Sequence, residues 1–342
     1  MTTSPDPLNA PPGSAEHIRP DRPFYAAGVL LDTPDFTAEQ LYHRGRLARS
    51  LAYLHGSGTV SGLRVVFESA LEPGATAPPN PDIPGDIERT YPEGREARIL
   101  VQPGLAIDRL GRLIEVPGPA CLRLAPWLKD RQNEQGSDSQ TDDQSETDES
   151  SATKSPIEQA THPAENDNIT ANISRDRSSS SITVSPDNRG IVADIFIRFT
   201  TCETGGKTPA FGGGPFDTTN ANVPARIRDS YELSLVLRTE ATADLAGELP
   251  RDPWANANDL EDIHNRLFAS WQETTAGWRQ GQPNRLPEHS SSQDTTDLFL
   301  ARLLIVSGEN DNPPTAQVDN FSRQFVYPSD AIARLIAITN SP

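Results

Sequence analysis

The chain has 342 residues, including 31 prolines and 23 glycines, with an apolar fraction of 35% and a formal net charge of -18. Its length allows two modest domains or one domain with a large insertion, and the low apolar fraction indicates extensive loops or disorder. The acidic charge makes nucleic acid and anionic lipid headgroups poor partners, because both bind cationic surfaces.

Residues 1–23 are expected to form a flexible N-terminal arm. The stretch from Met1 to Ser14 is polar and proline-rich and lacks the basic and apolar segments of a signal peptide. No apolar run reaches membrane-spanning length. We therefore expect synthesis and assembly in the cytoplasm, with no direct membrane insertion.

A module spanning residues 24–128 is expected to open with a helix. Thr37 and Gln40 form a capping-box pattern, which predicts a helix start at Thr37. The apolar face of the helix is expected to comprise Leu47, Leu51 and Leu54. Three arginines flank this face, namely Arg44, Arg46 and Arg49. Gly56 is the expected C-terminal stop.

Alternating apolar residues after Gly58 predict a mainly antiparallel β module. A hairpin turn is expected at Asp108 to Gly111, where glycine tolerates a positive φ. The expected strands lie within Val60–Phe67, Ala97–Val101, Leu105–Asp108, Leu113–Val116 and Cys121–Leu124.

Residues 129–181 are dominated by Ser, Thr, Asp, Glu, Gln and Asn, and large apolar residues almost vanish there. Such a segment cannot bury enough surface to offset its ordering entropy. We expect a long, disordered acidic insertion that separates the first module from a β-rich block at residues 182–342.

The C-terminal block combines predicted strands with amphipathic helices. A loop is expected from Gly205 to Val223, one helix from about Leu260, and another from Ser329 to Ile336. The expected strands are Ile191–Thr200, Tyr231–Arg238 and Leu298–Val306. The whole chain is therefore predicted to be an α+β protein, mainly β.

The residues that could carry chemistry do not form a recognisable catalytic, cofactor or metal motif. Gly206-Lys207-Thr208 lacks the upstream glycine of a phosphate-binding loop, since that position is Thr201. Glu39 and His43 are better explained as a solvated pair on one helix. Cys121 and Cys202 lie in apolar runs and are expected to be buried. We therefore expect a protein without enzymatic activity or cofactors.

Three segments carry a resemblance to a known family. Gly28 to Arg44 reads GVLLDTPDFTAEQLYHR, Leu54 to Val65 reads LHGSGTVSGLRV, and Val101 to Pro117 reads VQPGLAIDRLGRLIEVP. These motifs are similar to those of accessory or baseplate-associated proteins of phage-tail-like contractile injection systems. The resemblance covers about the first third of the chain well and the remainder only loosely.

The resemblance implies a structural subunit whose partners are baseplate, sheath or fibre proteins, with copies arranged by the symmetry of the particle. That particle is cytosolic, membrane-anchored or released. A local basic stripe on an acidic chain suits an acidic neighbour. The expected interaction residues are Arg44, Arg46, Arg49, His55 and Gly56. The competing interpretation is that the arginines simply solvate the helix.

Two other functions remain open at the level of sequence. A fibre-base or carbohydrate-binding module would use the tryptophans near the second helix, Trp254, Trp271 and Trp278. A hydrolase would need a site assembled from dispersed residues.

Overall fold

The computed structural model describes residues 22–28, 30–81, 83, 85–129, 190–209, 222–238, 249–255, 257, 259–280, 284–290, 293–306 and 313–339. The expected acidic insertion lies outside these residues except for Lys129, as does the expected N-terminal arm up to residue 21. Across the described residues the fold is α+β and mainly β, which confirms the predicted class.

The N-terminal part consists of one long helix and small antiparallel sheets. Helix α2 spans Thr33–His55. One sheet has the order β1-β6-β7, formed by Gly58–Gly62, Gly104–Ile107 and Leu113–Val116. A second has the order β2-β5-β8, formed by Val65–Glu68, Arg98–Val101 and Ala120–Arg123. A two-stranded hairpin joins β3 and β4, Ala75–Ala77 and Arg89–Tyr91.

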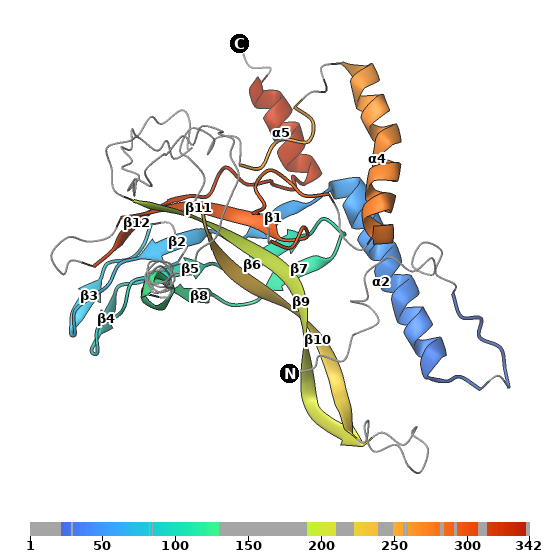
Figure 1. Ribbon diagram of the computed structural model, residues 1–342, viewed down its shortest axis with the longest axis horizontal. Helices are drawn as coiled ribbons and strands as arrows, with labels where there is room; N and C mark the ends of the chain where they lie inside the picture. The colour runs from blue at the N-terminus through green and yellow to red at the C-terminus, as the bar shows by residue number, and fades with distance from the viewer. Residues whose placement is uncertain are drawn as a thin grey trace, which may run out of the picture.

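The C-terminal part is built on an antiparallel four-stranded sheet with the order β10-β9-β11-β12. Its strands are β9 (Ile191–Pro209), β10 (Asn222–Leu237), β11 (Leu298–Val306) and β12 (Thr315–Asp319). Two helices accompany it, α4 (Leu260–Gln280) and α5 (Ser329–Thr339). Figure 1 shows the β9–β10 ribbon leaving the β body as a long arm and the helices α2, α4 and α5 standing outside the sheets.

Both parts of the sequence contribute to one hydrophobic core. Leu63, Ile99 and Ile114 from the N-terminal sheets belong to the same buried cluster as Ile195 and Leu303 from the large sheet. Strand β11 is buried from Leu298 to Ile305, because it lies between two other strands and is covered on both faces. The boundaries expected at residues 128 and 182 stay predictions.

Helix α2 begins four residues earlier than its expected start at Thr37. Asp32 is the N-cap, its side chain accepts from the Asp35 amide, and the Asp35 side chain accepts from the Asp32 amide. The Thr37 hydroxyl instead donates to the Thr33 carbonyl at 2.9 Å. Two aspartates therefore outcompete the threonine as caps. The stop at Gly56 is confirmed.

Two further expectations for strand regions are wrong. Part of the expected loop from Gly205 to Val223 is strand, because β9 continues to Pro209 and β10 starts at Asn222, with Thr208 opposite Val223. Cys121 and Cys202 are exposed rather than buried. In β8 the partly buried Ala120 and Leu122 alternate with exposed residues, which places Cys121 on the outer face.

The β body contacts α2 through the tip of the β6–β7 hairpin. Gly111 has a φ of +79°, and a Cβ built there would lie 1.8 Å from the Ala48 carbonyl oxygen. Only glycine permits both that backbone conformation and so close an approach. The tip of the hairpin therefore packs directly against the backbone of α2 at Ala48.

We predict that Gly111→Ala lowers the free energy of unfolding by about 2 kcal/mol or more, because it combines a positive φ with a backbone clash. Gly118→Ala is the matched control, since a Cβ there has no neighbour within 4 Å. Urea denaturation followed by circular dichroism measures both. Equal stability of the two variants would contradict the close contact.

Candidate interaction surface

The glycine-rich segment after α2 passes very close to a neighbouring turn. A Cβ on Gly62 would lie 2.1 Å from the Pro103 carbonyl oxygen, and a Cβ on Gly104 would lie 2.3 Å from the Ser61 carbonyl oxygen. Leu63, which follows, is fully buried with a φ of 56°. The segment that carries the family resemblance therefore serves close backbone packing.

The C-terminal residues clamp the same segment. Asn320 accepts from the Val65 amide and donates to the Val65 carbonyl, both at 2.8 Å. Arg323 is buried and donates to the Leu63 carbonyl at 2.8 Å. Thr59 donates its amide to the Gln324 carbonyl at 2.9 Å. Burial lowers the pKa of Arg323 to about 10, yet the side chain stays charged at neutral pH.

The β6–β7 turn is built around a buried aspartate. The Asp108 side chain accepts from the amides of Leu110 and Arg112 at 2.9 and 2.8 Å and from the Arg112 guanidinium at 2.6 Å. Burial raises the pKa of Asp108, and Arg112 opposes that rise. The Arg112 guanidinium also lies 4.8 Å from the centre of the Phe199 ring. The expected turn is thus an internal brace between the hairpin and β9.

A buried ionic group links the large sheet to the segment before β11. Arg302 makes two hydrogen bonds with the Asp194 carboxylate, at 2.7 and 2.8 Å, and Arg238 lies 3.4 Å from the same carboxylate. Arg238 also donates to the Glu288 carbonyl at 2.8 Å. Arg109 reaches the Thr295 carbonyl at 2.8 Å. These contacts fasten the described part of 284–297 to the β body.

Burial shifts the pKa values of three titratable side chains in that segment. Burial raises the pKa of Glu288 and raises the pKa of Asp297 to about 6, whereas it lowers the pKa of His289. The Leu286 amide points to Nδ1 of His289 at 3.3 Å, so Nε2 donates to the Asp297 carbonyl at 2.8 Å. The imidazole is therefore neutral and structural.

The five expected interaction residues lie on or beside the second half of α2, but the three arginines do not share one face. Arg44 is paired with Asp229 of β10 at 3.3 Å. The Arg46 guanidinium lies 5.5 Å from the centre of the Tyr42 ring, and burial lowers the pKa of the partly buried Arg49. His55 is exposed in the last turn and Gly56 caps it. Their role in binding stays a prediction.

The other sequence candidates occupy unconnected places. Glu39 and His43 lie 3.9 Å apart on the surface of α2. Lys207 and Thr208 lie in β9 opposite Pro224 and Val223, so their backbone is strand. Among the described residues, no group of three or more His, Cys, Asp or Glu side chains is arranged to hold a metal ion.

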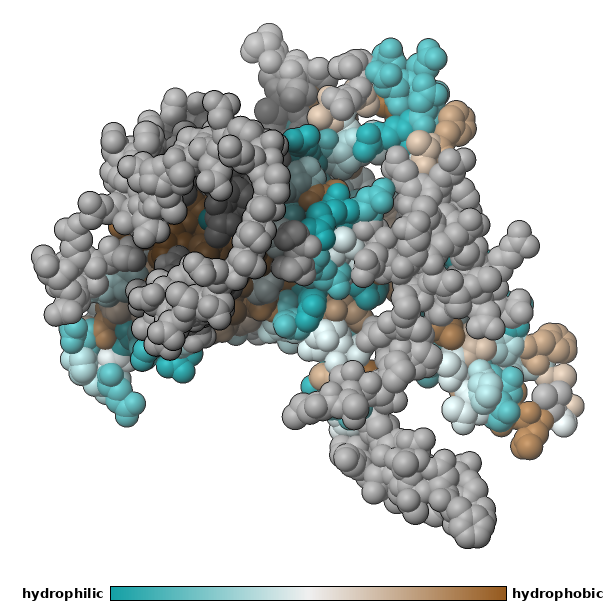
Figure 2. Space-filling view, viewed as in Figure 1, coloured by the Kyte–Doolittle hydropathy of each residue, from teal (hydrophilic) through white to brown (hydrophobic). Residues whose placement is uncertain are grey.

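Apolar side chains face outward on α2, α4 and α5, a feature that sequence periodicity could not reveal. Leu54 of α2 is 77% exposed, Phe268 of α4 is 78% exposed and Ile336 of α5 is 55% exposed. Figure 2 shows apolar surface at the outer end of α2 and on the described half of α4. Trp254, beside α4, is also exposed, with the Arg266 guanidinium 5.5 Å from its ring.

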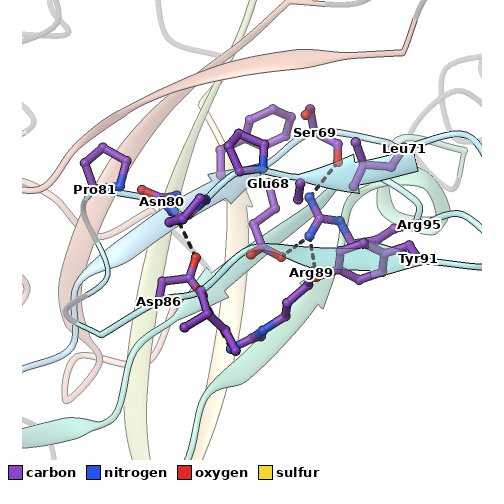
Figure 3. Close-up of a pocket in the computed structure, with 14 residues that line it drawn as sticks. Glu68, Ser69, Leu71, Asn80, Pro81, Asp86, Arg89, Tyr91 and Arg95 are labelled. Atoms are coloured by element: carbon purple, nitrogen blue, oxygen red, sulfur yellow. Dashed lines mark hydrogen bonds and ion pairs between the residues drawn. The ribbon is translucent and has the colours of Figure 1, made fainter. Parts of the chain in front are cut away.

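A cavity of about 280 Å³ lies between β2 and the β3–β4 hairpin (Figure 3). Glu68 lies 3.2 Å from Arg95, whose guanidinium lies 4.6 Å from the centre of the Tyr91 ring. Asp86 and Arg89 form a second pair at 3.3 Å. These charged side chains form ion pairs with one another. The geometry therefore supports a structural role for the residues that line this cavity.

Comparisons with protein-family profiles, curated proteins and solved structures found no match to this chain. None of the helices in the described ranges is both long and apolar enough to cross a membrane.

We predict that Arg323→Ala lowers the free energy of unfolding by about 3 kcal/mol, because it removes buried hydrogen bonds to the segment at Leu63. Arg228→Ala, at an exposed position of β10, is the control and should change stability by less than about 0.5 kcal/mol. Urea titration of both variants measures the difference. A similar loss in each would show that the clamp adds little.

We predict that Asp297→Asn stabilises the protein by about 1 kcal/mol at pH 8 and has little effect near pH 4. The folded protein holds this proton up to a pKa of about 6, so the folded state loses stability as pH rises from about 4 through 6. Thermal unfolding across this pH range tests the effect, with the exposed Glu115→Gln as control. Stabilisation independent of pH would contradict it.

Proposed function

We propose that this chain is a non-enzymatic structural subunit of a phage-tail-like contractile injection particle, as a baseplate-associated or peripheral component. The observation that carries the proposal is the outward-facing apolar surface of α2, α4 and α5 on a braced β body. Several large apolar side chains exposed on these helices favour contact with other proteins. Its partners are other particle subunits, and its copies follow the particle's symmetry.

The motifs behind the family resemblance support an architectural role. A Cβ at Gly62, Gly104 or Gly111 would collide with the backbone of another segment. The Asp108 carboxylate accepts hydrogen bonds from backbone amides of the turn that contains Gly111. Backbone packing and turn hydrogen bonds therefore explain why these positions hold glycine and aspartate, with no need for proton transfer or metal binding. Synthesis and assembly in the cytoplasm belong to this proposal.

Purification of particles from cells that express the affinity-tagged chain tests the proposal. We expect the tag to recover sheath-and-tube particles visible by negative-stain electron microscopy. Charge reversal of Arg44, Arg46 and Arg49 together should lower occupancy at least tenfold while circular dichroism stays unchanged. Reversal of the exposed Arg226 and Arg228 is the matched control. Recovery of the tagged chain without any high-mass assembly would refute the function.

A further inference from the structure

We draw no further inference here: the strongest candidate, the exposed apolar side chains Phe36, Leu47 and Leu54 on the surface of α2, carries none, because nothing in the described part of the structure shows what covers them.

Discussion

The packing of the backbone at residues 58–65 between two distant segments holds the rest of the fold in place. Gly62 approaches the turn at Pro103 so closely that no side chain fits, and Asn320 and Arg323 bind the carbonyls and amide on the other side. Each contact joins residues far apart in the sequence. Helix α2 ends at His55, directly before this segment, so the C-terminal end of the helix is anchored to the β body.

Polar interactions extend this frame into the large sheet. The pair formed by Asp194 and Arg302 is buried, so the attraction between the two charges is offset by the cost of removing both from water. Arg109 and Arg238 attach the segment before β11 through backbone carbonyls. The body is thus braced from within, while its helices keep their apolar faces outward. Rigid frames that present apolar surface suit assembly with other proteins.

Local patterns predicted much of this fold. The bounds of β7 and β11 match their expected strands, because short apolar runs with clear ends leave little ambiguity. The β3–β4 hairpin was missed because its three-residue strands are too short for a pattern. The clamp by Asn320 and Arg323 was also missed, since it joins positions more than 250 residues apart. The amphipathic pattern of α2 identified its apolar stripe but could not indicate that the stripe faces away from the body.

Native-state hydrogen exchange tests most directly whether the two sequence blocks form one cooperative body. The amides of Thr59 and Val326, which bridge the blocks, should exchange with the same opening free energy as those of Ile195 and Leu303 in the central strands. Exchange of the bridging amides through a separate opening of much lower free energy would contradict the account.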